Sequence, residues 1–213
     1  VHGPELTPVA DVVIDVALVV LAFAFLITAP RSSRHDAALL GTMVVAVTAL
    51  RVLMQPLPNV QPVTVAALLV GAQLGARRGV AFAILVTLLS NMLIGDGWWT
   101  LFQAAGWSAV AVLGSRLTLM KNGDFNHGQL YLAVIGSAFL FDALASLSIL
   151  TPGMGLIDFT IYLAHGIPFD ILHALGNLAF AVWFGPFVHR QLGGLESSDS
   201  FEQSVVEHHV ING

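Results

Sequence analysis

Seven long apolar stretches follow one another along the chain, and they constrain its fold more than any other feature. A helix needs roughly 20 residues to cross a hydrocarbon core of about 30 Å. The apolar stretches cover residues 12–29, 37–54, 63–76, 79–95, 100–119, 130–150 and 159–189. Their apolar residues are continuous instead of alternating with polar ones, which favours helices over the strands of a membrane barrel. The sequence therefore predicts an all-α integral membrane protein, folded as a compact helical bundle.

The composition supports this fold class. Of the 213 residues, 56% are hydrophobic and 10% are charged, so the polar side chains are too few to cover a soluble globule of this size. The chain has no cysteine, which excludes disulfides, thiolate metal sites and cysteine nucleophiles. No basic residues precede the first apolar stretch, and Arg31 and Arg34 follow it. We therefore interpret this stretch as a retained span and not as a signal peptide.

Two of the stretches are unusual in length. The stretch 63–76 is short for a full crossing, so we expect it to be tilted, met by a thinned bilayer or buried inside the bundle. The stretch 159–189 is long and contains Pro168, a residue that suits the first turn of a helix. We therefore predict a short segment before Pro168 and a full span over 168–189.

The basic residues predict the orientation in the membrane, because cytoplasmic loops collect Lys and Arg. With the N-terminus outside, seven of the 8 basic residues lie at cytoplasmic ends, and Arg51 is the exception. We expect a multi-pass protein of the cell membrane with a cytoplasmic C-terminus. The segment 193–213 is polar and acidic, and we expect it to be a disordered cytoplasmic tail.

Amide and aromatic side chains gather on the predicted outer side. The connection Pro56–Pro62 contains three prolines together with Asn59 and Gln61, so it is stiff and polar without charge. It is either a lid or a rigid turn between two helices. In the connection that follows 79–95, Trp98 and Trp99 suit the membrane interface.

Further polar groups lie deeper in the spans. Gln103 and Trp107 are four residues apart and share a helix face, and Asn91 approaches from the preceding span. Polar groups inside a membrane normally face the bundle interior or a cavity. We interpret these residues as the wall of an outward-open pocket, with interhelical hydrogen bonding as the alternative.

The last span carries a polar stripe. If Pro168 opens a helix, Asp170 lies in its first turn, and His173 and Asn177 follow on the same face. Asp142 lies in the middle of the stretch 130–150, where an unpaired carboxylate is costly.

We expect Asp142 to pair with His173 or His165, or to be protonated. An alternative function is nickel or cobalt uptake, in which these residues and Asp170 would bind the metal together with His2. A histidine in second place is found in nickel and cobalt uptake membrane subunits, which this chain resembles only there. The spacing matches no tight metal-binding motif.

Motifs for catalysis are absent from the sequence. There is no G-x-S-x-G elbow and no phosphate-binding G-x-x-x-x-G-K-[ST] loop. We expect no enzymatic activity, no cofactor and no nucleic-acid partner. Transport driven by ATP would need an ATPase from another chain.

Small residues recur every four positions on two spans. Ala38, Thr42 and Ala46 do so on the second, and a second ridge runs from Gly79 to Thr87 on the fourth. Such ridges let a partner helix approach closely. The partner is either internal, which is the default, or another subunit.

The region from about residue 38 to 190 resembles the substrate-binding S components of energy-coupling factor (ECF) transporters. Four segments carry the resemblance: ALR at 49–51 leading into PLPNVQPVT, GAQLGARRG at 71–79, SNMLIGDGWWTLFQAAGW at 90–107 and PFDILHALGNLAF at 168–180. The chain departs from the pattern at Asp96, Trp98 and Phe102, where Gln, Pro and Trp are expected. The family usually has six spans. Residues 1–36 are therefore interpreted as an N-terminal extracytoplasmic segment with an additional helix, and residues 37–192 as the S-component-like bundle.

The resemblance implies a vitamin-class ligand at the outer face, with Pro56–Pro62 as its lid. It also implies a transmembrane coupling subunit and two ATPase subunits as partners, with Ala38, Thr42 and Ala46 as a candidate coupling surface. Some members look like corrinoid transporters, so cobalamin is one expected ligand. The candidate substrate-binding residues are Asn59, Gln61, Asn91, Asp96, Trp98, Trp99, Gln103, Trp107, Asp142, His165, Asp170, His173 and Asn177.

Overall fold

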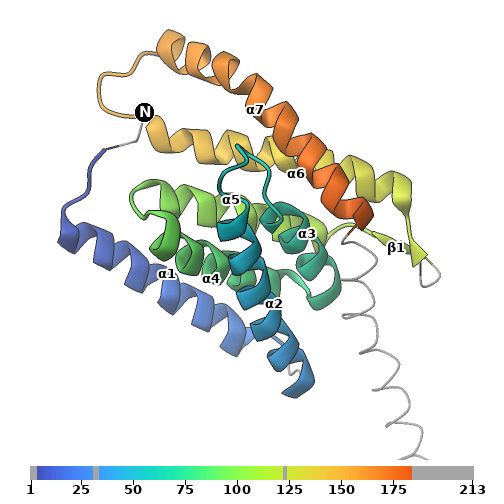
Figure 1. Ribbon diagram of the computed structural model, residues 1–213. Coiled ribbons are helices and arrows are strands. Elements are labelled where there is room, and N and C mark those ends of the chain that lie inside the picture. Colours follow the sequence, from blue (N-terminus) through green and yellow to red (C-terminus); the bar gives the residue numbers. More distant parts are fainter. Residues whose placement is uncertain (1–3, 31–33, 122–123, 184–213) are drawn as a thin grey trace, which may run out of the picture.

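A computed structural model describes residues 4–30, 34–121 and 124–183. The helices in this part of the chain are α1 (Pro8–Thr28), α2 (Arg34–Leu53), α3 (Val63–Leu74), α4 (Ala76–Ile94), α5 (Trp99–Gly114), α6 (His127–Ser146) and α7 (Leu156–Trp183) (Figure 1). A short 3-10 turn, Leu147–Ile149, extends α6, and the two-residue strands β1 (Met120–Lys121) and β2 (Asp124–Phe125) form a small hairpin between α5 and α6. Each apolar stretch of the sequence corresponds to one helix, so the predicted all-α bundle is confirmed.

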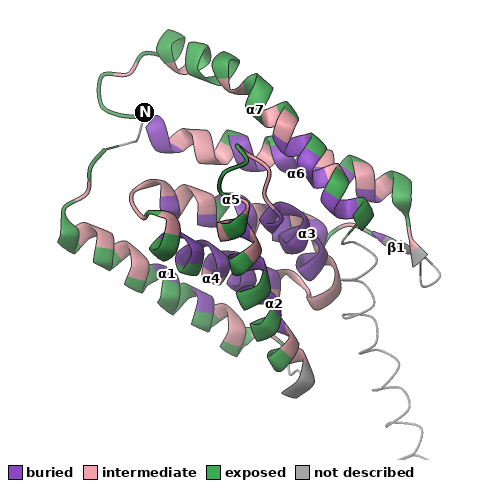
Figure 2. Cartoon of the chain, in the orientation of Figure 1, coloured by how far each residue is buried: buried purple, intermediate pink, exposed green. Residues whose placement is uncertain are grey.

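The lengths and hydropathy of the helices identify a multi-pass membrane protein. Within the described residues, 5 helices are long and apolar enough to cross a membrane: α1, α2, α4, α6 with its 3-10 turn, and α7. Their outward faces carry large exposed apolar side chains, such as Val12, Phe23 and Leu132. Figure 2 shows the exposed residues along the outer sides of α1, α2 and α7, where lipid would contact them.

The short third span is buried inside the bundle, as one of the three sequence-based options proposed. Helix α3 has 12 residues, and all of those from Val63 to Gly71 are buried (Figure 2). It packs closely against α5, because a Cβ atom on Gly71 would lie 2.0 Å from the carbonyl oxygen of Ala111, and one on Gly114 would lie 2.1 Å from that of Leu68. Backbone contact of this kind needs glycine, and in lipid it supplies much of the attraction between helices.

The two small-residue ridges have different surroundings. Gly79, like the rest of its ridge, is buried, and a Cβ atom on Gly79 would lie 2.9 Å from the Cα of Gly71, so this ridge serves internal packing. Ala38, Thr42 and Ala46 are instead exposed on the outer face of α2.

Helix α7 differs from its prediction. Pro168 lies inside one continuous helix of 28 residues instead of opening a new one, so Asp170 is in the middle of a helix and not in its first turn. A proline in a helix interior costs about 3 kcal/mol because one hydrogen bond is lost. Breaking the helix would leave several backbone groups without partners in an apolar environment, which costs more.

Helix α1 begins and ends with clear local signals and leans on α4. Thr7 accepts a hydrogen bond from Ala10 N at 3.2 Å, Pro8 occupies the first turn, and Ala29 before Pro30 is extended. The buried residues of α1 pack against α4. Arg77 Nη1 and Arg78 Nη2 from the start of α4 donate hydrogen bonds to the carbonyl oxygens of Thr28 and Pro30, the second at 2.7 Å.

Several sequence-based predictions concern residues outside the described part. These are His2, the tail 193–213, and the end of the predicted seventh span beyond Trp183.

Candidate ligand-binding site

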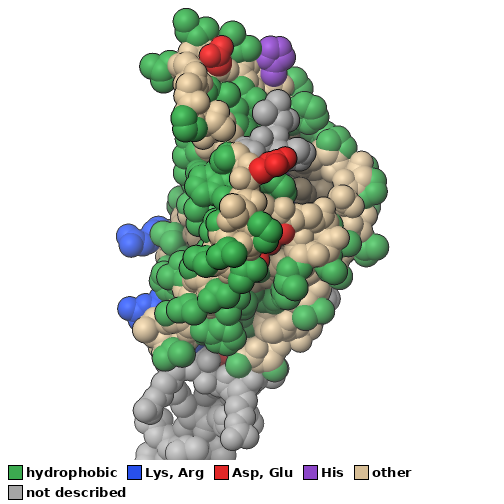
Figure 3. Space-filling model, turned by 90° about the vertical axis from the view of Figure 1, so that its left-hand side faces the viewer, with side chains coloured by type: hydrophobic (Ala, Val, Ile, Leu, Met, Phe, Trp, Pro, Cys, Tyr) green, Lys and Arg blue, Asp and Glu red, His purple; other side chains and the backbone are tan. Residues whose placement is uncertain are grey.

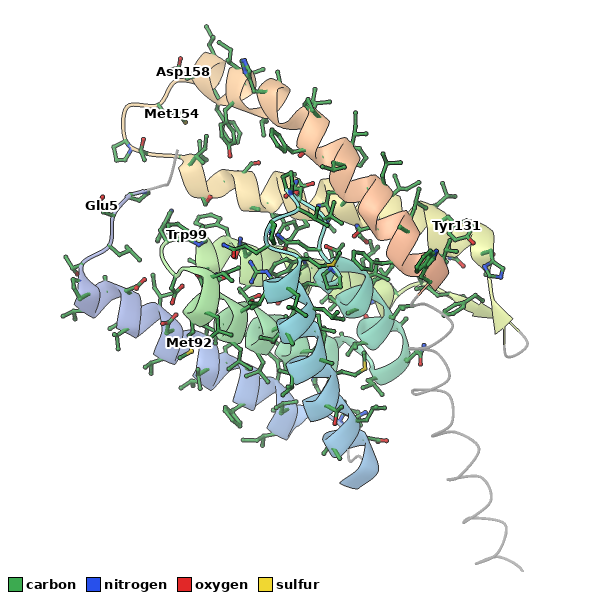
Figure 4. The ribbon with its side chains drawn as sticks, in the orientation of Figure 1. Glu5, Met92, Trp99, Tyr131, Met154 and Asp158 are labelled. Carbon is green, nitrogen blue, oxygen red and sulfur yellow. The ribbon has the colours of Figure 1, made fainter. Side chains whose placement is uncertain are left out.

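A cavity of about 370 Å³ opens between α6 and α7 where these two helices separate, at the end of the bundle that also holds the α2–α3 loop and the start of α5 (Figure 1). Its polar wall residues are Asn59, Gln61, Gln103, Asp142 and Asp170, together with Ser146 and Ser148. Its aromatic wall residues are Trp99, Phe141, Tyr162 and Phe169. Figure 4 places Trp99 at the start of α5, beneath α6.

The α2–α3 loop is tied across the cavity by Asn59. This residue has a φ of 56°, a left-handed conformation that Asn tolerates better than most residues. Its side-chain Nδ2 donates to Asp142 Oδ1 at 3.4 Å and to the carbonyl oxygen of Phe169 at 3.1 Å. One side chain thereby links the loop to both α6 and α7, which is the position that a lid or a rigid turn would take.

Beneath the cavity lies Arg51, whose side chain is only 2% exposed. Its guanidinium donates to Gln61 Oε1 at 3.3 Å, Asn91 Oδ1 at 2.8 Å and Gln103 Oε1 at 3.2 Å, and also to Ser90 Oγ. The guanidinium carbon lies 4.7 Å from the ring centroid of Trp107, a cation–π distance. A buried charge is tolerated only when its hydrogen bonds are made, and here four neutral oxygens and one ring surround it.

Arg51 fixes the orientation of the two amides on the cavity wall. A guanidinium can only donate hydrogen bonds, so the oxygens of Gln61 and Gln103 must face it. The oxygen of Gln103 also accepts from Asn91 Nδ2 at 2.9 Å. The NH₂ groups of Gln61 and Gln103 have no hydrogen-bond partner among the described residues, and these amides line the cavity. On this side the cavity therefore presents two hydrogen-bond donors to a ligand, the NH₂ groups of Gln61 and Gln103.

A second buried chain lies between α3, α5, α6 and α7. Asp142 Oδ2 lies 2.9 Å from His173 Nδ1, and His173 Nε2 lies 2.8 Å from Thr64 Oγ1. Trp107 Nε1 donates to the same Thr64 oxygen at 3.0 Å. With the His173 proton on Nδ1, every donor in this chain meets an acceptor. Of the alternatives predicted for Asp142, the structure shows the pairing with His173 and not with His165.

Stacked rings connect the two buried groups with the cavity wall. Trp107 stacks on Phe141 with ring centroids 4.4 Å apart and an angle of 18°. Phe141 meets His173 edge-on at 5.5 Å. Because Phe141 lines the cavity, displacement of Trp107 or His173 would alter the wall.

The structure thus divides the predicted binding residues into groups. Six of them line the cavity: Asn59, Gln61, Trp99, Gln103, Asp142 and Asp170. Four others lie buried behind the wall: Asn91, Trp107, His173 and Asn177. Asn177 joins α7 to α6, because its Nδ2 donates to Val134 O at 3.1 Å. The remaining three, Asp96, Trp98 and His165, lie elsewhere.

Asp96 and Trp98 belong to a different part of the surface. Asp96 Oδ1 accepts from Gly97 N at 2.8 Å and from the hydroxyl of Thr100, so it stabilises the start of α5. Both residues line a second hollow of about 460 Å³ beside the beginning of α1. Trp98 packs edge-on against Phe102, with ring centroids 5.2 Å apart.

His165 does not join the other polar residues of α7. It is exposed, and its Nδ1 lies 2.8 Å from the carbonyl oxygen of Ile161 in its own helix. Residues 4–30, 34–121 and 124–183 contain no group of three or more His, Asp or Glu side chains placed to hold a metal ion. Both ring nitrogens of His173 are already engaged.

The sequence-based prediction missed Arg51, Thr64, Ser90 and Thr100. For Arg51 there was a signal, since it was the one basic residue on the wrong side of the predicted topology. A basic residue that breaks the charge rule in an apolar span is a candidate for a buried site. The three hydroxyl residues carry no comparable signal, because Ser and Thr are common in membrane helices.

Comparison with known protein families identifies the family of this chain. Residues 31–191, more than half of the chain, match a family described as "Family of unknown function (DUF6580)", and the chain belongs to it. The match covers α2 to α7 and leaves α1 outside. No curated protein and no solved structure matches the sequence.

Proposed function

We propose that this member of the family is the membrane-embedded binding subunit of an uptake transporter for a vitamin-class micronutrient. The observation that carries the proposal is the open cavity between α6 and α7, with polar and aromatic walls above a hydrogen-bonded interior. Ligand sites in proteins are concave, have volumes of about 300–1,000 Å³ and hold a few placed polar groups among apolar ones. The cavity meets the criteria of concavity and volume, and it combines aromatic with polar wall residues, although its lining is more polar than that of most such sites.

A purely structural membrane protein is the main competing interpretation, and it requires the polar residues to satisfy one another. Behind the wall the groups around Arg51 and His173 do so, whereas the side-chain oxygen of Asn177 has no partner among the described residues. On the wall they do so only in part, because the amide donors of Gln61 and Gln103 have no hydrogen-bond partner among the described residues and these amides line the cavity. Polar groups that face a cavity inside a membrane protein normally serve a ligand.

The proposed topology places this cavity on the side from which a nutrient arrives. With the N-terminus outside and the C-terminus in the cytoplasm, the α2–α3, α4–α5 and α6–α7 connections all lie outside the cell. The exposed face of Ala38, Thr42 and Ala46 is the proposed docking surface for a transmembrane coupling subunit. Two ATPase subunits would supply the energy.

The size of the cavity restricts the ligand. A volume of about 370 Å³ is near the lower end of the range of about 300–1,000 Å³ for ligand sites. It suits a small vitamin with one or two rings. A corrinoid such as cobalamin would leave most of its ring system outside, so we favour the smaller ligands. No contact in the described residues favours the alternative of nickel or cobalt uptake.

Ligand retention and thermal stability test the proposal. The full chain is purified in detergent or nanodiscs, small molecules are extracted and identified by mass spectrometry, and the unfolding temperature is measured against a panel of vitamins. One compound should raise the unfolding temperature. Tyr162→Ala, on the cavity wall, should reduce this shift, whereas Ile161→Ala, an exposed neighbour that does not line the cavity, should preserve it. A well-folded protein that retains no compound and responds to none would refute the proposed function.

A further inference from the structure

The charged side chains on the cavity wall are all acidic. Asp142 and Asp170 border the cavity from α6 and α7, and among the described residues that line it there is no Lys, Arg or His. Figure 3 looks onto the end where these helices separate, and it shows scattered acidic side chains and a His on this face, with Lys and Arg on its left side. The two carboxyl groups also lie within hydrogen-bonding reach of each other. When both are ionised they repel each other, and a shared proton or a cation between them removes that repulsion.

Arg51 does not take the place of such a cation. Its guanidinium is 2% exposed and does not border the cavity. Its hydrogen bonds go to Gln61, Ser90, Asn91 and Gln103, and none of those found in the described residues goes to a carboxylate. Asp142 is instead held by His173 and Asn59.

The aromatic residues add a second feature suited to cations. Trp99, Tyr162 and Phe169 border the same cavity as the two carboxyl groups. The face of an aromatic ring attracts a cation within about 6 Å of its centroid, most strongly when the ring is Trp, and several rings together recognise ammonium groups. Rings on the wall also stack on a flat heteroaromatic ligand.

The opposite wall has the reverse polarity. Because Arg51 holds the oxygens of Gln61 and Gln103, their NH₂ groups are the part left for a ligand. These groups can only donate hydrogen bonds. The cavity is therefore polarised, with acidic groups from α6 and α7 on one side and amide donors from the α2–α3 loop and α5 on the other.

From this polarity we infer that the ligand is a small organic cation, an ammonium compound or a positively charged heteroaromatic ring, which also carries a hydrogen-bond acceptor. Its positive charge lies against Asp142 and Asp170 among the rings of the wall, and its acceptor meets Gln61 and Gln103. This inference rests on the proposed function and specifies the ligand class of the same site.

Pairs of probes that differ only in charge test the inference in the full chain in nanodiscs. One pair is 1-methylnicotinamide and its neutral isostere 3-methylbenzamide, and the other is choline and 3,3-dimethylbutan-1-ol. The co-purified ligand is identified in the same preparation. We expect each cation to bind at least tenfold more tightly than its isostere, a difference of about 1.4 kcal/mol, and we expect the co-purified ligand to be a cation.

Two matched substitutions locate the effect. Asp170→Asn removes one of the two carboxyl groups and should reduce the preference for cations, whereas Asp158→Asn, near the start of the same helix and not among the residues that line the cavity, should leave it unchanged (Figure 4). If Asp170→Asn does not fold, Trp99→Leu replaces it. This substitution should reduce the preference at least threefold, and Trp98→Leu, outside this cavity, should not.

The outcomes separate the two proposals. Equal binding of cations and isosteres, or a neutral or anionic co-purified ligand, refutes the inference and leaves the binding function intact. If the probes are too weak to measure, the charge of the co-purified compound or of the best vitamin in the panel decides. If no compound of any charge binds, the proposed function fails and the inference fails with it.

Discussion

Replacing Arg51 by methionine should cost less stability than the loss of four hydrogen bonds suggests. Of the four acceptors, Ser90 still donates to Val86 O, Gln103 Oε1 still accepts from Asn91, and Gln61 is half-buried at the cavity, where water can reach it. Only Asn91 Oδ1 becomes a buried acceptor without a partner, which costs about 1–3 kcal/mol.

Two further effects of the substitution partly cancel. The cation–π contact with Trp107 is lost, at a cost of about 1–2 kcal/mol. The desolvation penalty of the buried guanidinium also disappears, and this penalty is several kcal/mol for an ion in a protein interior. We therefore expect Arg51→Met to lower the free energy of unfolding by about 1–3 kcal/mol.

The substitution Asn91→Leu should be more harmful, although Asn91 is uncharged. It leaves the Arg51 charge buried with fewer partners, and Thr100 and Gln103 also lose a donor. Breaking one side of a buried charged interaction typically costs about 3–5 kcal/mol. In the double variant no buried charge remains. The double variant should therefore lose less free energy of unfolding than the two single variants together, by at least about 1.5 kcal/mol, the lower value for a hydrogen bond to a charged group.

Reversible unfolding by SDS in mixed micelles, followed by far-UV circular dichroism, measures all three variants. Arg116→Met is the matched control, because Arg116 is exposed after α5, and it should change stability by less than about 0.5 kcal/mol. Neutral hydrogen bonds between membrane helices couple by about 0.6 kcal/mol on average. Additivity of the two single variants within about 0.5 kcal/mol would show that Arg51 and Asn91 do not act as one unit, and would refute the reasoning.

Three further predictions concern the bundle. Gly71→Ala places a Cβ 2.0 Å from Ala111 O and should lower the free energy of unfolding by more than about 3 kcal/mol. The control Gly41→Ala, whose added Cβ has no atom within 4 Å, should not lower it. Equal unfolding curves for the two variants would contradict the close α3–α5 contact. The double variant Arg77→Ala, Arg78→Ala removes two hydrogen bonds to the end of α1, each of about 1 kcal/mol. Amide hydrogen exchange should become faster in α1, while α3 stays protected. Unchanged exchange in α1 would refute the role of these two arginines in holding α1 against α4. Pro168→Ala returns a backbone N–H to the middle of α7 and should raise the free energy of unfolding by roughly 2 kcal/mol. A loss of stability in thermal unfolding would contradict the continuous helix.

The helices were predictable from the sequence, because the length of an apolar run and the need to satisfy backbone groups are both local. The length of the stretch 63–76 left three possibilities open, and the structure selects burial inside the bundle. The fifth stretch was predicted too long, because α5 has 16 residues and is not among the described helices that are long enough to cross a membrane. The interpretation of Pro168 was wrong for a different reason. The local preference of proline was weighed without the cost of breaking a helix in an apolar environment, and that second cost depends on the whole bundle.

The site was only partly predictable. His173 was one of two partners predicted for Asp142, with protonation as a third possibility, because an isolated charge in a span needs a partner. The structure selects His173. Arg51 lies near the end of its helix, where a basic side chain would normally extend to the interface. Its inward direction depends on how α2 is rotated against α4, and the apolar pattern of α2 does not fix that rotation.

The division between wall and interior explains why the buried polar residues matter although a ligand would not touch them. Gln61 and Gln103 could present either end of their amides to a ligand. The guanidinium of Arg51, which can only donate, decides between the two for Gln61, and it does so together with Asn91 Nδ2 for Gln103. In the same way, Asn59 and His173 hold the Asp142 carboxyl group at the wall. A site whose groups are already fixed loses little entropy when a ligand binds. Arg51→Met should therefore weaken ligand binding more than its modest effect on stability suggests, because the Gln61 amide becomes free to turn and Gln103 is held by Asn91 alone.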